Sequence, residues 1–261
     1  MSDPRSTPDP SLSLLSEPAQ IRVAISDLMR SPEGPRDRQL LFGDRVTVLH
    51  RQQNWALIRS DKDRYCGWVV SAALGPVTTP THRVTVRATH VYRAADFKSP
   101  EIMSLSFGSA LTALSETATF IETSLGYIPR QHVHAADAYA TDPAAIAEIF
   151  LGTPYLWGGN SSFGIDCSGL VQAACLACNI PCSGDTDQQQ TMVGTALAEG
   201  TVLKRNDVIF WKGHVALVSD PDTIIHANAG YMSTVFEPLT DALARIETQG
   251  DGRPTAFRRL L

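Results

Sequence analysis

The chain contains two stretches that share one pattern. Residues 42–58, "FGDRVTVLHRQQNWALI", align without gaps on residues 107–123, "FGSALTALSETATFIET". The matched pairs are Phe42 with Phe107, Gly43 with Gly108, and Trp55 with Phe120. After a loop that is shorter in the second copy, "GWV" at residues 67–69 matches "GYI" at residues 126–128. The pattern indicates a duplicated small β unit.

The residues around each copy favour strands. "QIRVAI", "DRVTVLH", "NWALIRS" and "GWVVS" are short runs of β-branched and aromatic residues separated by turn formers. The pattern resembles that of bacterial SH3-like barrels. It has a turn glycine, an aromatic residue in the next strand and a closing "GW" or "GY". That resemblance implies a barrel at residues 19–78 and a second at residues 79–136, after a flexible tail at residues 1–18. "GPVTTPTH" at residues 75–82 is the expected linker.

The remaining residues, 137–261, predict helices first and strands afterwards, an α+β pattern. Asp142 is a plausible N-cap, Pro143 suits the first turn, and Gly152 is expected to end this helix. Strand-like "DVIFW", "HVALVS" and "TIIHAN" follow a second helical run. The predicted fold is therefore α+β, with two small barrels followed by an α+β domain.

The stretch "GIDCSGLVQAACLACNI" places Cys167 at the expected start of the second helix. Asp166 is a suitable N-cap, and apolar residues with helical spacing continue to Asn179. Free backbone N–H groups and the positive end of the helix dipole favour a thiolate in the first turn. The same groups are suited to bind a tetrahedral oxyanion. These features make Cys167 a candidate nucleophile, although a cysteine at a helix start is often structural.

Two histidines are candidates for the base and its orienting partner. "SDPD" is typical of a turn, and a hairpin centred near Asp220 would place His214 and His226 opposite each other on adjacent strands. One imidazole could then meet Cys167 while the other orients it. A histidine in a strand is also commonly a half-buried structural residue.

The motifs "YLWGG", "GIDCSGLVQ", "NDVIFW", "HVALV" and "IIHAN", in this order, resemble the NlpC-type, papain-like cell-wall peptidase family. The resemblance covers about residues 140–261. It implies Cys167 as nucleophile, His214 as base and His226 as orienting residue. Tyr155 matches a tyrosine placed to support the nucleophile or the oxyanion.

The resemblance also implies substrate-binding residues. Asp166, Ser168 and Trp157 fall in motifs that line the substrate groove. "SGDTDQQQ" resembles an Arg-Asp-x-x-Gln segment, with Asp185 at the acid, but Gly184 stands where the family has arginine. Similar three-domain peptidases close one end of the groove with the first barrel. Tyr65 and Asp44 are the candidates in this chain to meet the ammonium of a terminal L-alanine.

Other signals have weaker interpretations. Cys175, Cys178 and Cys182 have a spacing that could suggest metal, but no fourth ligand is evident. "CLAC" lies late in its helix, where redox pairs are uncommon. His132 and His134 share a face of an extended segment and most simply belong to a connector. No metal or cofactor is expected.

Charge and cysteine content limit the possible partners. A net charge of -5 argues against nucleic-acid binding, and no apolar run reaches the length of a membrane span. Five cysteines cannot all pair within one chain, and the N-terminus lacks a signal-like segment. A cytoplasmic location is therefore expected.

The resemblance implies cysteine-dependent hydrolysis of the γ-D-glutamyl–diamino acid amide in peptides such as L-Ala-γ-D-Glu-diamino acid, in the recycling of released wall peptides. Two alternatives remain open. The chain could be a non-catalytic module that binds wall peptides, or an amidase or acyltransferase of the same superfamily.

Overall fold

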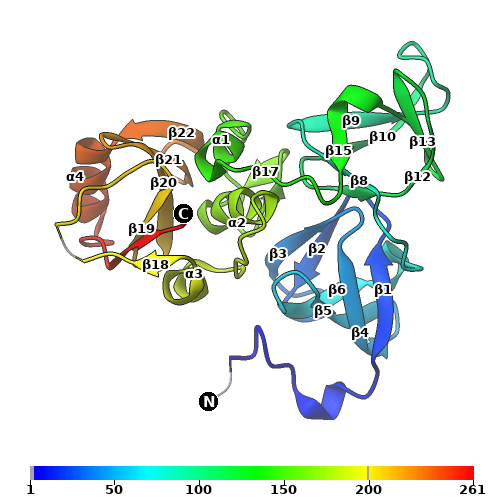
Figure 1. Ribbon diagram of the computed structural model, residues 1–261. Helices are drawn as coiled ribbons and strands as arrows, with labels where there is room; N and C mark the ends of the chain where they lie inside the picture. Colours follow the sequence, from blue (N-terminus) through cyan, green and yellow to red (C-terminus); the bar gives the residue numbers. More distant parts are fainter. Residues whose placement is uncertain (1–2, 199) are drawn as a thin grey trace. The chain divides into compact units, whose positions relative to one another are not determined.

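The computed structural model describes residues 3–198 and 200–261 and divides between Ala138 and Tyr139 into two compact units (Figure 1). The first unit is built from strands, and the second combines helices with a sheet. Within the described residues, no helix has both the length and the apolar character needed to cross a lipid bilayer.

The first β module of unit 1 has strands in the order β3-β2-β6-β5-β4-β1-β7, with antiparallel pairing. The bounds are β1 Glu17–Ile21, β2 Ile25–Met29, β3 Arg36–Leu41, β4 Arg45–Gln52, β5 Trp55–Ser60, β6 Cys66–Val70 and β7 Leu74–Gly75, with the 3₁₀ helix η2 at Ser71–Ala73. Its core contains Leu28, Val48 and Ile58, which are fully buried.

The segment predicted to be a flexible tail makes contacts with this module. It contains the 3₁₀ helix η1, Pro10–Leu12, and strand β1 already begins at Glu17. The N–H of Leu15 donates to the carbonyl of Leu49 at 2.9 Å, and the side chain of Leu15 packs on the core. The last residues of the predicted tail are thus ordered, because they supply apolar and backbone contacts to the module.

The second β module contains a five-stranded sheet, β10-β9-β14-β13-β12, and a three-stranded sheet, β11-β8-β15. The bounds are β8 His82–Val84, β9 Ala88–Tyr92, β10 Glu101–Ser106, β11 Ala110–Leu111, β12 Ala113–Glu116, β13 Phe120–Thr123, β14 Gly126–Pro129 and β15 Val133–Ala135, with η3 at Arg130–His132. It has its own core, which includes Val91, Leu105 and Ile121. That this module is a second SH3-like barrel stays a prediction.

The duplicated sequence forms the same turn twice. Gly43 and Gly108 both have left-handed backbone, with φ of 87° and 86°. The N–H of Gly43 donates to Ile21 at 2.9 Å, and the N–H of Gly108 donates to Val84 at 2.9 Å. A residue with a side chain rarely adopts this φ, which explains why both copies have glycine here.

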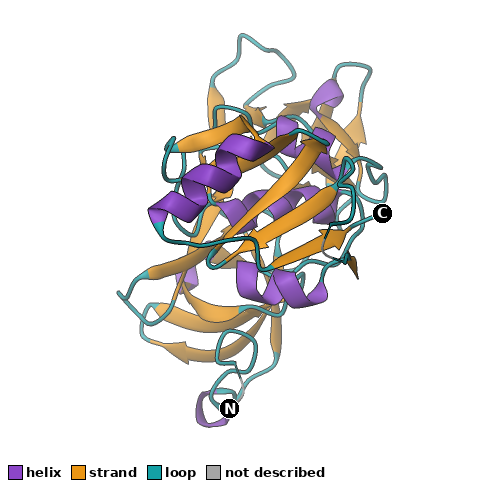
Figure 2. Ribbon diagram, turned by 90° about the vertical axis from the view of Figure 1, so that its left-hand side faces the viewer, coloured by secondary structure: helices purple, strands orange, loops and turns teal. Residues whose placement is uncertain are grey.

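Unit 2 has a six-stranded sheet in the order β18-β23-β19-β20-β21-β22. Its helices are α1 Pro143–Glu148, α2 Cys167–Ala177, α3 Thr186–Met192 and α4 Leu239–Gln249. Its strands are β16 Asn160–Ser161, β17 Gly164–Ile165, β18 Thr195–Ala196, β19 Asp207–Trp211, β20 His214–Asp220, β21 Thr223–Asn228, β22 Ser233–Pro238 and β23 Ala256–Arg259. In Figures 1 and 2, α4 lies across one face of the sheet, and α1 and α2 lie on the other.

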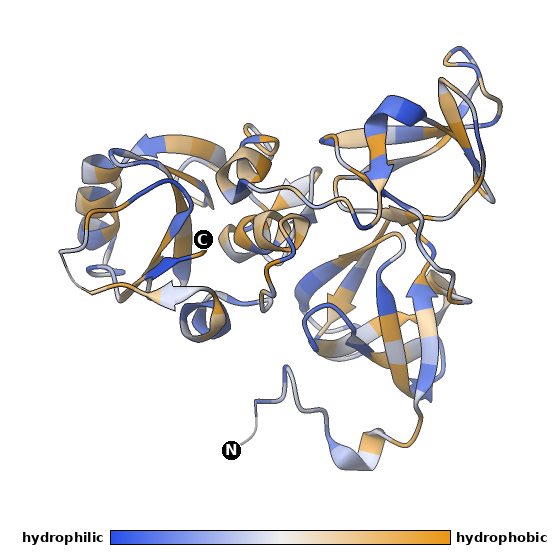
Figure 3. Ribbon diagram, in the orientation of Figure 1, coloured by the Kyte–Doolittle hydropathy of each residue, from blue (hydrophilic) through white to orange (hydrophobic). Residues whose placement is uncertain are grey.

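Helices α2 and α4 differ in hydropathy, because α2 is more deeply buried than α4. In Figure 3, α2 is coloured mostly on the hydrophobic side of the scale, whereas α4 alternates between hydrophilic and hydrophobic turns. Most of α2 is buried, while α4 buries only Ala242 and Ile246 against the sheet. Helix α1 begins after Asp142 as predicted, but it ends at Glu148, and turns carry the chain to Gly152.

Candidate active site

The N-terminus of α2 is held by one carboxylate. Oδ1 of Asp166 accepts from the N–H of Gly169 at 2.6 Å and from the hydroxyl of Ser168 at 3.0 Å. Oδ2 accepts from the N–H of Gly158 at 2.9 Å. Asp166 therefore caps α2, as predicted, and also ties the preceding loop to it. Asp166 and Ser168 are buried, and their contact with substrate stays a prediction.

The thiol of Cys167 is buried at the first position of α2, with 6% of the residue exposed. Its Sγ lies 3.9 Å from the hydroxyl of Thr186, and the backbone N–H groups of Val215 and Ser168 also bond to it. Val215 follows His214 in β20, so these contacts bring the thiol against the start of the strand that carries the predicted base.

The acidity of Cys167 differs from the sequence-based expectation. Burial, together with the negative charge of Asp166, raises the pKa of this thiol to about 12 against the smaller effects of the three hydrogen bonds. Desolvation thus outweighs the helix terminus. The resting side chain is a neutral thiol, so a nucleophile forms only when a base removes its proton.

The hydroxyl of Tyr155 lies within range of the charge of Cys167. Burial, followed by the charges of Cys167 and Asp166, raises the pKa of the Tyr155 hydroxyl well above its usual value. The hydroxyl therefore stays protonated and can act as a hydrogen-bond donor. Its backbone is held by a parallel bridge to Ile165 and by its N–H, which donates to Met232 at 3.0 Å.

The two predicted histidines meet. Nε2 of His214 lies 2.9 Å from Nδ1 of His226, and the ring centroids are 5.1 Å apart. The predicted register was wrong by two residues, because Leu217 pairs with Ile225 and an irregularity follows between Val218 and Asp220. Continuing this register places His226 opposite Ala216 and diagonal to His214. A shift of two residues keeps both side chains on one face of the sheet, which is why they still meet.

Behind His226 lies a polar cluster that the sequence did not reveal. Its Nε2 is 2.9 Å from Oε2 of Glu237 in β22 and 3.0 Å from Nδ2 of Asn228. Arg245 of α4 donates to both oxygens of Glu237, at 2.8 and 2.7 Å. Glu237 occurs in an otherwise ordinary strand, "STVFEP", and nothing in that pattern indicates that its side chain points inward.

Burial lowers the pKa of both imidazoles. It lowers that of His214 to about 3, helped by the nearby charges of His226 and Arg245 and opposed by Glu237. It also lowers the pKa of His226 to about 3, helped by Arg245. Both rings are therefore neutral near pH 7, and a neutral imidazole is the form that accepts a proton.

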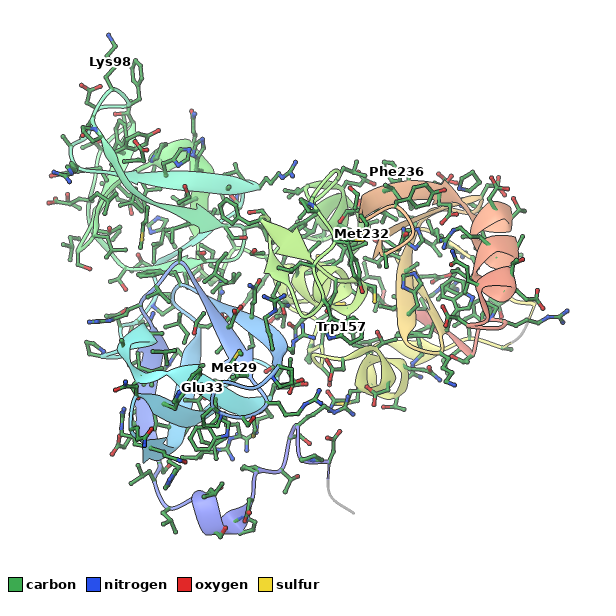
Figure 4. All side chains as sticks on the ribbon, turned by 180° about the vertical axis from the view of Figure 1, so that it is seen from behind. Met29, Glu33, Lys98, Trp157, Met232 and Phe236 are labelled. Atoms are coloured by element: carbon green, nitrogen blue, oxygen red, sulfur yellow. The ribbon has the colours of Figure 1, made fainter. Side chains whose placement is uncertain are left out.

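Trp157 and Asp185 are the other predicted substrate-binding residues of unit 2. Trp157, labelled in Figure 4 with Met232, is 69% exposed on unit 2, and Met232 is 59% exposed. Asp185 occupies the N-cap position of α3, but its side chain makes no capping hydrogen bond.

In unit 1, Asp44 accepts from the N–H of Leu41 at 2.9 Å and pairs with Lys62 at 2.6 Å. Tyr65 is 3% exposed, and the guanidinium of Arg38 lies over its ring. Both residues thus have internal contacts in their own module. Their role toward substrate stays a prediction.

The remaining cysteines are unpaired thiols. Cys175 and Cys182 are buried, and burial raises the pKa of the Cys178 thiol to about 11. Among residues 3–198 and 200–261, no three histidine, cysteine or acidic side chains gather as a metal site would require. His132 instead bonds through Nδ1 to the hydroxyl of Thr89 at 2.8 Å.

Comparison with known proteins identifies the domains. Residues 152–245 match the NlpC/P60 family, and residues 28–74 match the bacterial dipeptidyl-peptidase Sh3 domain. The chain is 29% identical to the gamma-D-glutamyl-L-lysine dipeptidyl-peptidase of Bacillus subtilis (strain 168), over 78% of this chain and 76% of that protein. It is 27% identical to dipeptidyl-peptidase 6 of Lysinibacillus sphaericus, over 74% and 80% of the two chains.

Solved structures show the same fold. An NlpC/P60 family protein from Bacillus cereus ATCC 10987 superimposes with a TM-score of 0.79 at 21% identity, covering 94% of this chain and all of that one. Unit 2 has a helix that begins at a cysteine and a sheet in which two histidines are in contact. The match to the NlpC/P60 family lies within unit 2, and the match to the bacterial dipeptidyl-peptidase Sh3 domain lies within unit 1.

Proposed function

We propose that this protein is a cysteine peptidase that hydrolyses the amide between γ-D-glutamate and a diamino acid in peptides derived from peptidoglycan. The observation that carries the proposal is the contact of His214 with His226, 2.9 Å between Nε2 and Nδ1, next to the strand residue that bonds the Cys167 thiol. These contacts support Cys167 as nucleophile, His214 as base and His226 as orienting group.

In this mechanism His214 acts as a general base. Nε2 of His214 faces His226, so Nδ1 is the nitrogen that takes the proton from Cys167. The sulfur then attacks the γ-carbonyl carbon, and the carbonyl electron pair moves to oxygen. When the tetrahedral intermediate collapses, the C–N bond breaks and the amine leaves with the proton from His214. Water, deprotonated by the same imidazole, hydrolyses the thioester and releases the carboxylate and the thiol.

Two features would stabilise the oxyanion of that intermediate. The N–H of Ser168 in the first turn of α2 bonds to the thiol, and the protonated hydroxyl of Tyr155 lies within range of its charge. Donors that are already oriented stabilise developing negative charge without reorganisation. Exposed Trp157, on the loop tied down by Asp166, is available for contact with the peptide.

The substrate class rests on the relatives. Two curated relatives that share about three quarters of their length with this chain are named as dipeptidyl-peptidases, one of them for γ-D-glutamyl-L-lysine. The match of residues 28–74 to the bacterial dipeptidyl-peptidase Sh3 domain supports the same class. The five unpaired thiols suit a reducing compartment, which supports a role in recycling released peptides in the cytoplasm.

The test is turnover of L-Ala-γ-D-Glu-L-Lys, followed by mass analysis of the products, alongside the meso-diaminopimelate peptide. Release of L-Ala-D-Glu and free lysine supports the proposal. Binding without turnover would indicate a peptide-binding module, and transfer of the acyl group to an added amine in preference to water would indicate an acyltransferase.

An N-acetylated tripeptide tests the predicted closed end of the groove. If Asp44 and Tyr65 help to recognise the terminal ammonium, acetylation lowers kcat/KM at least about tenfold, because a neutral amide cannot replace the charged hydrogen bonds of the ammonium. Equal turnover of both peptides would exclude recognition of the ammonium. The variant Tyr65→Phe separates recognition by the hydroxyl from packing of the ring.

A further inference from the structure

The polar cluster behind His226 determines where protons can lie in the histidine pair. His226 and Glu237 are 0% and 2% exposed, so water does not compete for their contacts. The guanidinium of Arg245 donates from Nε to Oε1 of Glu237 and from Nη2 to Oε2. A carboxylate held in this bidentate way is ionised, and an ionised carboxylate only accepts hydrogen bonds.

Asn228 presents the opposite chemistry to the same ring nitrogen. The N–H of Tyr231 donates to Oδ1 of Asn228 at 2.9 Å, which turns the amide NH₂ toward Nε2 of His226 at 3.0 Å. Nε2 of His226 therefore lies beside a donor from Asn228 and an acceptor from Glu237. In a neutral imidazole, Nε2 either carries a proton and donates to Glu237, or is bare and accepts from Asn228. Which of these two hydrogen bonds forms fixes the tautomer of His226.

The two tautomers have opposite consequences for His214. If Nε2 of His226 carries the proton, it donates to Glu237, and the bare Nδ1 accepts a hydrogen bond from the Nε2–H of His214. Nδ1 of His214 is then bare and can take the thiol proton. If Nε2 of His226 is bare, its Nδ1 donates to Nε2 of His214, and Nδ1 of His214 carries a proton and cannot act as a base.

We propose that Glu237, kept ionised and oriented by Arg245, selects the productive tautomer of His226 and through it that of His214. Glu237 is thus a positioning residue that reaches the reaction through two imidazoles. The role in catalysis rests on the proposed function, whereas the tautomer itself does not depend on any substrate.

The charges around the pair are consistent with this assignment. Three elements bring polar groups to the pair, namely β22 with Glu237, α4 with Arg245 and β21 with Asn228. Trp211 of β19 packs beside His214, with ring centroids 5.7 Å apart. Tyr231 lies against Arg245, with its hydroxyl 3.5 Å from Oε1 of Glu237. Arg245 disfavours a protonated imidazole at either position, as does burial. The pair therefore remains neutral, and only its tautomer is left to be selected.

Glu237→Gln is the decisive variant. A glutamine has one acceptor oxygen for three donors, namely Nε and Nη2 of Arg245 and the Nε2–H of His226. We expect kcat to fall at least about 100-fold with little change in KM, by analogy with the amide substitution in serine peptidases that imposes the wrong tautomer. Glu247→Gln is the matched control, because it makes the same change in an exposed ion pair with Arg253 and should leave activity unchanged.

Two readouts separate positioning from loss of structure. Nitrogen-15 NMR of the wild type should show both His214 and His226 protonated at Nε2 and bare at Nδ1, and Glu237→Gln should reverse this. Alkylation of Cys167 by iodoacetamide, followed at peptide level, should be slower in Glu237→Gln and unchanged in Glu247→Gln. Neither measurement requires a substrate.

The possible results distinguish failure of the Glu237 assignment from failure of the proposed function. A wild-type protein with the opposite tautomers, or a folded Glu237→Gln variant that keeps wild-type tautomers and alkylation rate, would overturn the inference. If the wild type shows the expected tautomers but cleaves no peptide, the proposed function fails while the assignment of Glu237 stands. If Glu237→Gln does not fold, the wild-type spectrum still decides between the two tautomers.

Discussion

Nε2 of His214 and Nδ1 of His226 lie 2.9 Å apart although the hairpin does not pair the two residues directly. Diagonal neighbours on one face of a sheet have backbones about 7–8 Å apart, a gap that two imidazole rings can bridge. The diagonal arrangement leaves one edge of His226 for His214 and the other for Glu237 and Asn228. A chain of contacts therefore runs from the start of β20 to Arg245 on α4.

Replacing Cys167 with alanine should abolish hydrolysis without loss of the fold. The side chain supplies the nucleophile, while Asp166 caps α2 through backbone and Ser168 contacts that do not involve sulfur. Turnover by mass analysis and the thermal unfolding midpoint measure the two effects. Cys178→Ala, at the C-cap of the same helix, is the control and should remain active. Residual turnover by a folded Cys167→Ala protein would sink the mechanism.

His226→Ala should lower kcat by about 100-fold or more and change KM little, because an orienting residue acts on the base and not on the bound peptide. Steady-state kinetics over a range of peptide concentrations separate the two constants. Asn228→Ala is the comparison, since Asn228 contacts the same imidazole from the donor side. If His226→Ala behaved as wild type, the contact with His214 would have no part in catalysis.

Stability should decrease in acid, in part through His226. Burial lowers the pKa of His226 to about 3 in the folded state, while an unfolded histidine titrates near about 6.5. Between these values the unfolded chain binds a proton that the folded chain does not. Above about pH 6.5, His226 is neutral in both states and the free energy of unfolding does not depend on pH through this group. As the pH falls from about 6.5 toward 3, the free energy of unfolding decreases by about 1.4 kcal/mol per pH unit.

The pH test compares slopes. Denaturant unfolding at several pH values between about 5 and 7 gives the free energy of unfolding of the wild type and of His226→Gln. Carboxylates contribute to both proteins, so the difference in slope isolates the histidine. Parallel slopes would show that His226 is not buried in its neutral form.

Asp166→Ala should destabilise unit 2 by about 1–2 kcal/mol, because the N–H of Gly169 loses its cap. It should also reduce kcat, since the N–H of Gly158 is released and Cys167 begins the affected turn. Asp142→Ala removes the analogous cap of α1 and should cost stability alone. Thermal unfolding and turnover decide this, and equal losses of activity in both variants would argue against a local effect at Cys167.

Local sequence signals predicted much of the fold. Asp166 before Cys167 determines where α2 starts, because a cap needs only residues within three positions. Gly43 and Gly108 determine two matching turns for the same reason, since the required φ is a property of one residue. Alternation along β20 and β21 placed His214 and His226 on one face, and period-two alternation survives a register error of two residues.

Contacts between distant segments decided the remainder. The register shifts by one residue between Val218 and Asp220, which the turn motif alone does not reveal. The thiol of Cys167 has a raised pKa because other elements bury it, and desolvation depends on everything that surrounds a group. Glu237 meets His226 only because β22 pairs beside β21 and α4 brings Arg245 over it. The sequence alone therefore determined the candidate nucleophile and base, whereas the tertiary structure decided their protonation and the residues that orient them.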